Sequence, residues 1–198
     1  GSFEKKTSYD PRSPYSASKA SSDHLVRSWH HTFGLPVLLS NCSNNFGPWQ
    51  FPEKLIPLSI LKTYLNQPIP IYGDGKNIRD WLFIDDHIEA LLLIAKKGKI
   101  GESYCIGGQG ERTNKEVVMK ICEIMDRFYP NDSPHQNLIQ YVSDRPGHDK
   151  RYSINPKKIK NQLNWQPKYY FDEALEKTVK WYLSNLDWLK KNLDKKHI

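Results

Sequence analysis

Two residues that could carry proton-transfer chemistry, Tyr15 and Lys19, stand four positions apart in the stretch PYSASKA, where the other side chains are small or proline. Ser13 directly before a proline is typical of a helix start, so we expect a helix over residues 14–33, ended by Gly34. On a helix, residues i and i+4 share a face, and an ammonium beside a phenol favours the phenolate. The spacing therefore predicts Tyr15 as a general base supported by Lys19. Taken alone, such a pair is more often an ordinary surface pair, so its context must decide.

The rest of the chain alternates strand and helix patterns. Strands are expected within residues 35–41, 69–85, 102–108 and 138–154, and the second range holds two strands around the turn Gly73-Asp74-Gly75. Helices are expected within residues 52–65, 85–98, 113–128, 155–165 and 172–193. Pro57 is expected to interrupt the first of these helices, and residues 41–49 to form a polar loop. This alternation indicates an α/β architecture with a largely parallel sheet.

Composition narrows the class of protein. The chain has 198 residues, of which 38% are hydrophobic and 26% charged, so it should form one sizeable domain or two small ones around a packed core. No apolar run approaches the roughly 18 residues of a membrane span, and residues 1–6 lack an apolar signal core, so we expect a cytosolic protein. Cys42, Cys105 and Cys122 show no paired spacing, which favours reduced thiols and no zinc site.

The net charge of +7 could attract nucleic acid, a membrane surface or a phosphorylated small molecule. No RNA-binding aromatic pattern or helix-turn-helix pattern accompanies it, so nucleic acid is not expected. His30, His31 and the run Asp85-Asp86-His87 are adjacent rather than four apart, and we interpret them as surface and cap residues rather than metal ligands. Gly108-Gln109-Gly110 lacks the third glycine of a dinucleotide loop and predicts a turn.

Three further motifs give Tyr15 and Lys19 their context. They are NCSNNFGP at residues 41–48, PEKLIP at residues 52–57 and DRPGHD at residues 144–149. Together with the Tyr-x-x-x-Lys pattern, they resemble the extended short-chain dehydrogenase/reductase family, and within it the nucleotide-sugar 4,6-dehydratases that act on dTDP-glucose. The resemblance runs from about Ser13 to Trp181.

The resemblance implies an internal redox cycle. In the family, the tyrosine takes the proton of the glucose 4-hydroxyl while hydride leaves C4 for NAD. A carboxylate pair then eliminates water across C5 and C6, and the hydride returns to C6, which gives dTDP-4-dehydro-6-deoxyglucose. It also implies a cytoplasmic enzyme that is a homodimer in its full-length form.

The resemblance also assigns roles to individual positions. It implies that Tyr15 is the base and that Lys19 binds the nicotinamide ribose. It implies that Asn44 contacts the sugar, that Lys54 and Leu55 lie at the diphosphate and base, and that Pro70 and Tyr72 lie beside the thymine. It implies that Arg79, Asn114 and Arg145 bind the diphosphate and nucleoside, with His148 nearby. Simpler interpretations stay open. Arg79 could pair with Asp80, Asn114 could belong to a helix cap with Thr113, and Tyr72 could be core. Asn44 could be a turn residue, and Arg145 and His148 could be exposed loop residues.

Two parts of the family pattern are absent from this sequence. Nothing before Tyr15 supplies the strand, Gly-rich turn and helix that hold the NAD pyrophosphate, or the T-D-E triplet of the elimination step, and the segment Thr7-Ser8-Tyr9-Asp10 does not match that triplet. We therefore expect the carboxy-terminal portion of such an enzyme, inactive by itself. It should self-associate through the sheet edge and helix face left open, or be the ordered remainder of a longer polypeptide.

The expected fold is thus the remainder of a Rossmann-like parallel sheet plus a small mixed α/β substrate-binding domain. Residues 13–47 and 78–97 are assigned to the NAD-binding remnant, and residues 48–77 and 98–198 to the nucleotide-sugar domain. Two alternatives stay open: a sister 4,6-dehydratase or epimerase acting on another nucleotide sugar, and a non-catalytic nucleotide-sugar binding module.

Overall fold

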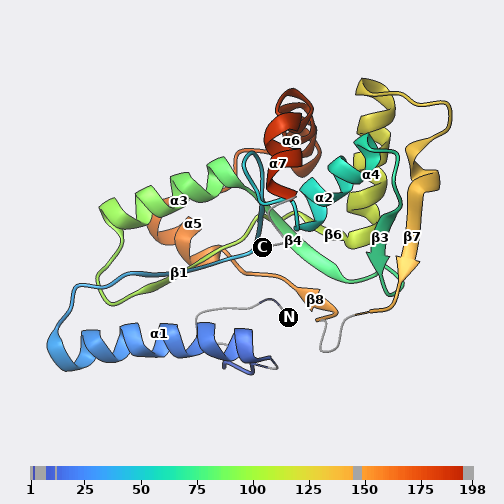
Figure 1. The fold of residues 1–198 in the computed structure, drawn as a ribbon. Coiled ribbons are helices and arrows are strands. Elements are labelled where there is room, and N and C mark those ends of the chain that lie inside the picture. The colour runs from blue at the N-terminus through green and yellow to red at the C-terminus, as the bar shows by residue number, and fades with distance from the viewer. Residues whose placement is uncertain (1, 3–7, 12, 145–148, 194–198) are drawn as a thin grey trace.

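The computed structural model describes residues 2, 8–11, 13–144 and 149–193 (Figure 1). The helices are α1 (Pro14–Phe33), α2 (Leu55–Tyr64), α3 (Ile84–Lys97), α4 (Asn114–Phe128), α5 (Lys157–Leu163), α6 (Phe171–Ser184) and α7 (Leu186–Leu193), with a short 3-10 helix, η1 (His135–Leu138). The strands are β1 (Leu39–Cys42), β2 (Asn44–Phe46), β3 (Ile69–Tyr72), β4 (Ile78–Phe83), β5 (Ser103–Ile106), β6 (Glu111–Thr113), β7 (Ile139–Val142) and β8 (Arg151–Tyr152).

Most strand pairings in the described chain are parallel. β1 pairs with β5, β2 with β4, β3 with β7 and β8 with β4 in parallel, whereas β6 pairs with β4 in the antiparallel direction. Parallel pairs need crossover connections, and here these connections are largely helical. The expectation of an α/β fold with a largely parallel sheet is confirmed.

The pair β1–β5 lies between two helical layers. Figure 1 shows α1 on one side of these strands and α3 with α5 on the other. The core on the α3 side contains Tyr104 and Ile106 of β5, Ile94 of α3 and Ile159 of α5, all buried. In contrast, Ala20 is the one buried residue of α1, so most of this helix is open to solvent.

A second core lies among α2, α4, α6 and α7. α4 turns six residues into it or into the adjoining β3–β7 core: Val117, Val118, Ile121, Cys122, Ile124 and Met125. Such an amphipathic pattern is typical of a helix that covers a sheet or other helices. The start of α2 joins the two groups, because Leu55 packs against both of them.

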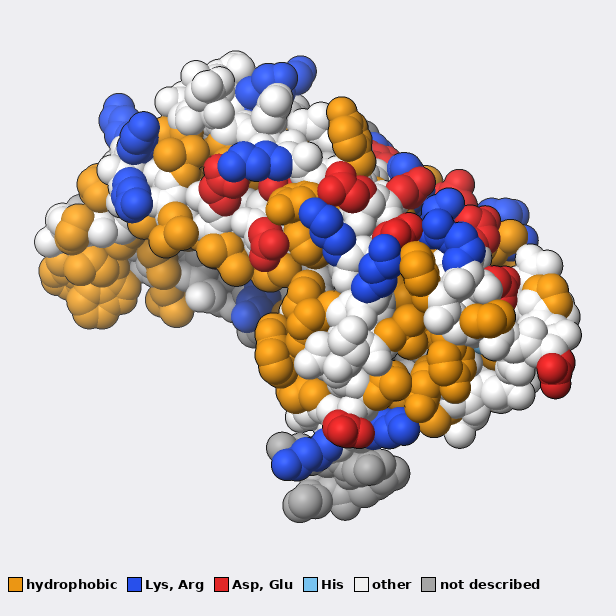
Figure 2. All heavy atoms as spheres, turned by 90° about the horizontal axis from the view of Figure 1, so that it is seen from above, with side chains coloured by type: hydrophobic (Ala, Val, Ile, Leu, Met, Phe, Trp, Pro, Cys, Tyr) orange, Lys and Arg blue, Asp and Glu red, His pale blue; other side chains and the backbone are white. Residues whose placement is uncertain are grey.

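The surface seen in Figure 2 mixes acidic and basic side chains. Several charged side chains of the described residues form ion pairs, including Lys168 with Glu89 (2.7 Å) and Arg127 with Glu176 (2.7 Å). Part of the positive charge of the chain is therefore balanced locally.

The local signals for helix ends are confirmed. The Oγ of Ser13 accepts a hydrogen bond from the backbone N–H of Ser16 (3.1 Å), and Gly34 ends α1 in the left-handed conformation with φ 69°. Thr113 and Glu116 form both hydrogen bonds of a capping box at the start of α4.

Some sequence expectations are wrong. Pro57 does not interrupt α2, because it lies in the first turn, where a missing N–H leaves no hydrogen bond unmade. The expected loop at residues 41–49 contains β2, which pairs with β4. The long helix expected at 172–193 is broken between α6 and α7 at Asn185, whose Nδ2 donates to the carbonyl of Trp181 (2.8 Å). The break lets Leu189 of α7 pack into the second core.

The interpretation of Asp86 as a surface or cap residue is also wrong. It is buried, and its carboxylate accepts hydrogen bonds from the backbone N–H groups of Lys168 (3.0 Å) and Tyr169 (3.2 Å), which ties α3 to the segment before α6. The division into an NAD-binding remnant and a substrate domain stays a prediction. The pairing of β1 with β5 crosses the boundary that the division draws.

Candidate active site

Side-chain contacts fix the direction in which α1 crosses β1 and β5. The Nη2 of Arg27 donates to the Oγ of Ser103, at the start of β5 (3.0 Å). One turn earlier in α1, the Oδ2 of Asp23 accepts from the Nδ2 of Asn41, near the end of β1 (2.9 Å). The amino end of α1 therefore points toward the carboxyl ends of these parallel strands. Ligands of open α/β sheets bind at that edge, so Tyr15 stands on the side where a cofactor or substrate is expected.

Tyr15 and Lys19 lie on the same side of α1. The Nζ of Lys19 is 5.7 Å from the centroid of the Tyr15 ring, which is within the range of a cation–π contact. Tyr15 exposes 71% of its surface, so its hydroxyl is not sealed inside hydrocarbon. The spacing read from the sequence thus gives the expected proximity, and the phenol is open to a ligand.

A polar cluster that the sequence did not reveal fastens the segment before Tyr15. The hydroxyl of Tyr9 donates to Asp23, the same carboxylate that binds Asn41. Burial, together with this contact to Asp23, raises the pKa of Tyr9 to about 12, so the phenol keeps its proton as a donor. The cluster joins residues far apart in sequence, and its only local signal is the polar position of Asp23 on α1.

The second group of candidate residues gathers around the start of β4. The register of β4 with β6 pairs Ile78 with Thr113, so Arg79 on β4 and Asn114 at the first position of α4 lie near each other. The backbone N–H of Lys115 donates to the carbonyl of Gly75 (3.1 Å). This contact brings the turn after β3 against the start of α4.

The turn connects these residues to Pro70 and Tyr72. Both lie on β3, where Pro70 is half-buried and Tyr72 is 37% exposed. Gly75 has φ 72°, and a Cβ there would lie 2.8 Å from Ile71, so the turn requires glycine. The structure thus brings Pro70, Tyr72, Arg79 and Asn114 to one region.

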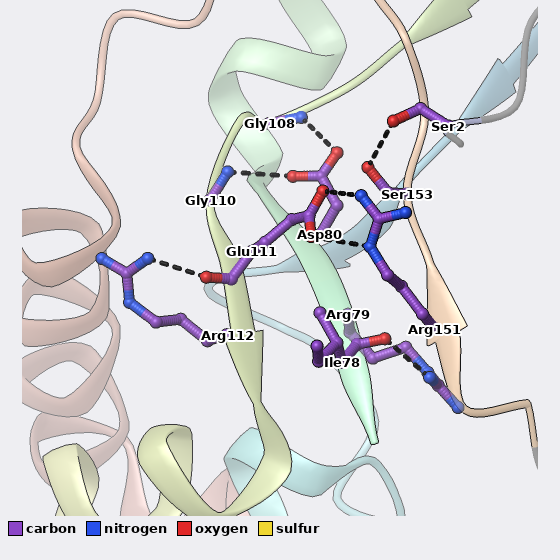
Figure 3. A network of polar contacts seen from close by, with 10 residues as sticks. All are labelled: Ser2, Ile78, Arg79, Asp80, Gly108, Gly110, Glu111, Arg112, Arg151 and Ser153. Carbon is purple, nitrogen blue, oxygen red and sulfur yellow. Dashed lines mark hydrogen bonds and ion pairs between the residues drawn. The ribbon is translucent and has the colours of Figure 1, made fainter. Parts of the chain in front are cut away.

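Arg79 is held by backbone carbonyls. Its Nη1 donates to the carbonyl of Ile78 (2.7 Å) and its Nη2 to that of Asp149 (2.8 Å), as Figure 3 shows for the first contact. Arg145 and His148 lie outside the described residues. The residues on either side of them reach this region, because Asp144 lies against Gly73 and Asp149 contacts Arg79 and Asn77.

Asn44, Lys54 and Leu55 come from the β2–α2 connection. Asn44 lies on β2 opposite Trp81 of β4. Lys54 is the residue before α2, and its Nζ is 2.8 Å from a carboxylate oxygen of Glu53, with both side chains partly exposed. Leu55 packs against the cluster that contains Ile69 and Ile71, which places the start of α2 beside β3.

Asp80, which the sequence suggested only as a possible partner of Arg79, has a different role in the structure. It is 1% exposed, and its carboxylate accepts from the backbone N–H groups of Gly108 (3.1 Å) and Gly110 (2.9 Å) (Figure 3). Burial raises its pKa, against the opposing effect of these N–H groups. A Cβ at Gly108 would lie 1.9 Å from the carbonyl oxygen of Trp81, so the turn fits here only with glycine. The turn predicted at 108–110 is thus an anchor between β5 and β4.

A pocket of about 540 Å³ opens beside this anchor. Asp80, Gln109, Arg112 and Ser153 are among its lining residues. Glu111 also lines it and binds Arg151 through two hydrogen bonds, of 2.9 and 2.7 Å, so this guanidinium holds the pKa of Glu111 below its usual range.

The described residues contain neither a candidate metal-ion site nor a candidate membrane-spanning helix. No group of three or more His, Cys, Asp and Glu side chains there is arranged to hold a metal ion. None of the helices described is long and apolar enough to cross a membrane.

Comparison with known proteins finds relatives over almost the whole chain. A family model described as GDP-mannose 4,6 dehydratase matches residues 1–178. A dTDP-glucose 4,6-dehydratase of Xanthomonas campestris pv. campestris is 54% identical over 196 residues, which make up 98% of this chain and 56% of the relative.

Two solved structures of dTDP-glucose 4,6-dehydratases are also similar to this chain. The crystal structure of dTDP-glucose 4,6-dehydratase from Bacillus anthracis in complex with NAD has a TM-score of 0.89 and 44% identity, and the match covers 97% of this chain and 59% of that one. The enzyme of the same name from Streptomyces venezuelae, with NAD bound, has a TM-score of 0.90 and 40% identity, with 97% and 57% covered. The chain spans about half the length of these relatives, and the resemblance read from the sequence is confirmed.

Proposed function

The chain belongs to the family described as GDP-mannose 4,6 dehydratase, and we propose that it is part of an NAD-dependent 4,6-dehydratase that converts dTDP-glucose to dTDP-4-dehydro-6-deoxyglucose and water. The observation that carries the proposal is the Tyr15–Lys19 pair at the carboxyl edge of β1 and β5, with the Nζ 5.7 Å from an exposed phenol ring. The relatives compared above are named for their action on dTDP-glucose.

Tyr15 is the proposed general base. Its phenolate oxygen takes the proton of a sugar hydroxyl, and the ammonium of Lys19 lies 5.7 Å from the centroid of its ring. Lys19 and Tyr15 also offer an ammonium and a hydroxyl to ribose hydroxyls, so both fit the nicotinamide end of NAD. NAD, when bound, supplies the hydride chemistry, and its pyrophosphate is proposed to bind outside this chain.

The residues around β3, β4 and α4 are the proposed nucleotide-sugar site. A guanidinium such as that of Arg79 binds phosphate oxygens with forked donors, and Asn114 offers an amide beside it. Arg145 and His148 are proposed to complete the contacts to the diphosphate. Pro70 and Tyr72 are proposed to flank the base.

The start of α2 completes the proposed site. Lys54 and Leu55 are assigned to the diphosphate and base, and Asn44 to the sugar. Leu55 supports this placement, because it packs beside β3, which carries Pro70 and Tyr72. The pair Lys54–Glu53 must open if the ammonium is to reach a phosphate.

The proposal concerns a cytoplasmic enzyme of which this chain is a portion. We expect no turnover of dTDP-glucose by the 198-residue chain alone, because the Gly-rich nucleotide turn and the carboxylates of the elimination step are missing from it. The full-length form is proposed to be a homodimer.

Calorimetry with the 198-residue chain tests the proposed site. We expect dTDP to bind more tightly than UDP or CDP, and Arg79→Ala to weaken dTDP by about 1.5–3 kcal/mol, the range for hydrogen bonds to charged groups. Arg127→Ala is the matched control, because Arg127 pairs with Glu176 on α6 instead (2.7 Å). Preference for UDP or CDP would favour a sister enzyme. Absence of binding to any of the three would contradict the proposed site.

The remaining alternative is a non-catalytic binding module. An activity assay of the polypeptide encoded by the whole gene distinguishes such a module from an enzyme. We expect the whole polypeptide to turn over dTDP-glucose with NAD. Tight dTDP binding without any turnover by that polypeptide would favour the module, and turnover by the 198-residue chain without added protein would contradict the expected inactivity.

A further inference from the structure

The loop between β2 and α2 contains a backbone conformation that needs outside support. Trp49 has φ 65°, in the left-handed region that residues with a side chain rarely adopt. Such residues persist where the surrounding structure holds them. The contacts that hold Trp49 in this conformation therefore also fix the shape of the loop.

One buried hydroxyl spans the strained turn. The Oη of Tyr182, on α6, donates to the carbonyl of Gln50 (2.7 Å) and lies 3.3 Å from the carbonyl of Gly47. These two carbonyls flank the segment Pro48-Trp49. Tyr182 is 0% exposed, and burial raises its pKa, so the phenol remains protonated as a donor.

The side chain of Trp49 is supported by the same helices. Its ring packs edge-on against Trp181 of α6, with centroids 4.7 Å apart, and against Trp188 of α7, with centroids 5.2 Å apart. Trp49 nevertheless remains 61% exposed. The hydroxyl of Tyr182, in contrast, contacts backbone carbonyls on both sides of Trp49.

Both ends of the loop carry candidate ligand residues. At the strand end, the Nε2 of Gln50 donates to the carbonyl of Asn45 (2.8 Å), the residue directly after Asn44. At the helix end, the backbone N–H of Lys54 donates to the carbonyl of Phe51 (3.1 Å). The position of Lys54 relative to Asn44 therefore depends on the shape of the loop between them.

We propose that Tyr182 is a positioning residue of the nucleotide-sugar site, which sets Asn44 against Lys54 and Leu55 by holding the Gly47–Gln50 turn. This inference rests on the proposed function for its ligand. α6 and α7 carry no candidate ligand residue, but by supporting this turn they have a role in the site. Tyr182 itself touches neither ligand nor cofactor.

The test compares Tyr182→Phe with two controls in the 198-residue chain. Phenylalanine keeps the buried ring and removes the donor, whereas Tyr170→Phe alters a phenol that is 84% exposed. Val179→Ala lowers stability from a buried position one turn earlier in α6 and keeps the hydroxyl of Tyr182. Amide hydrogen exchange over residues 47–58 and the dissociation constant of dTDP are measured for each variant.

For Tyr182→Phe we expect amide exchange in the loop and the dissociation constant of dTDP each to rise about fivefold, the size expected for one net hydrogen bond. Tyr170→Phe and Val179→Ala should leave both quantities close to those of the parent chain. Unchanged loop exchange in Tyr182→Phe, faster exchange without weaker dTDP binding, or equal effects of Val179→Ala would each overturn the inference. If the parent chain does not bind dTDP, the proposed function fails, and the exchange measurement still decides whether Tyr182 holds the loop.

Discussion

At the scale of single residues, exposure separates side chains that can meet a ligand from those that hold the fold. Tyr15 is 71% exposed, whereas Asp80 and Asp86 are each 1% exposed. Both buried carboxylates accept two backbone N–H groups, as buried charges must have partners. Tyr15 is therefore suited to chemistry, and the two aspartates are suited to fixing the segments that they contact.

Replacing Tyr15 by phenylalanine tests the proposed base. In a full-length enzyme of the proposed kind, we expect kcat for dTDP-glucose to fall about 10²–10⁴-fold, because the proton acceptor is lost. The affinity for dTDP should hardly change, since the diphosphate contacts remain. Steady-state kinetics and calorimetry check the two expectations, with Tyr170→Phe as the exposed control. An unchanged kcat would show that another group accepts the proton.

At the scale of elements, α4 links the core to the candidate site. Its buried face fills the second core, and its first residue, Asn114, lies beside β4. The capping box fixes this start: the Oγ1 of Thr113 accepts from the N–H of Glu116 (3.1 Å), and a carboxylate oxygen of Glu116 accepts from the N–H of Thr113 (2.7 Å). Loss of the cap should therefore loosen both the helix end and the ligand contacts beside it.

Thr113→Ala should lower the free energy of unfolding by about 1 kcal/mol, the usual effect of losing a helix cap. Urea denaturation measures the change. Thr32→Ala, at an exposed position in the last turn of α1, should have an effect of less than about 0.5 kcal/mol. Equal effects of the two substitutions would contradict a special role for the cap.

The capping box should also give a defined pH dependence. The backbone N–H of Thr113, and after it the hydroxyl, hold the pKa of Glu116 below its usual range. The stabilisation of the fold by the Glu116 carboxylate is therefore complete above the unfolded-state pKa of ~4.3, and it is lost as the pH falls through the lower folded-state pKa. Parent and Glu116→Gln chains should differ in urea stability at pH 7 and converge in acid. A difference that grows in acid would contradict this sign.

At the scale of the whole molecule, α1 leaves an apolar stripe uncovered. Leu25, Trp29 and Phe33 stand at i, i+4 and i+8 and expose 60%, 54% and 69% of their surfaces. The rings of Trp29 and Phe33 pack against each other, with centroids 4.8 Å apart. Exposed apolar stripes of this kind are typical of protein interfaces. The stripe suits the self-association expected from the sequence.

Sedimentation at micromolar concentration tests this association. We expect the parent chain to sediment as a species larger than a monomer, and Leu25→Glu with Trp29→Glu to sediment as a monomer, because two carboxylates would have to be buried in the contact. Tyr170→Glu introduces charge at an exposed site away from α1 and should keep the parent behaviour. A monomeric parent chain would argue against association through α1.

The sequence by itself determined the features whose partners lie within a few residues. The start of α1 at Ser13, the capping box of Thr113 and Glu116, and the shared face of Tyr15 and Lys19 all depend on contacts between positions three or four apart. Such contacts form whenever the helix forms, so residue type and spacing suffice to predict them.

The tertiary structure alone decided which distant segments meet. Asp80 binds backbone groups 28 and 30 positions away, Asp86 binds those of Lys168 and Tyr169, and Tyr182 reaches Gln50 across 132 positions. No local pattern marks these contacts, because they depend on how the cores bring helices and strands together. Packing also broke the last helix at Asn185, since Leu189 is buried against the other helices only if the chain turns there.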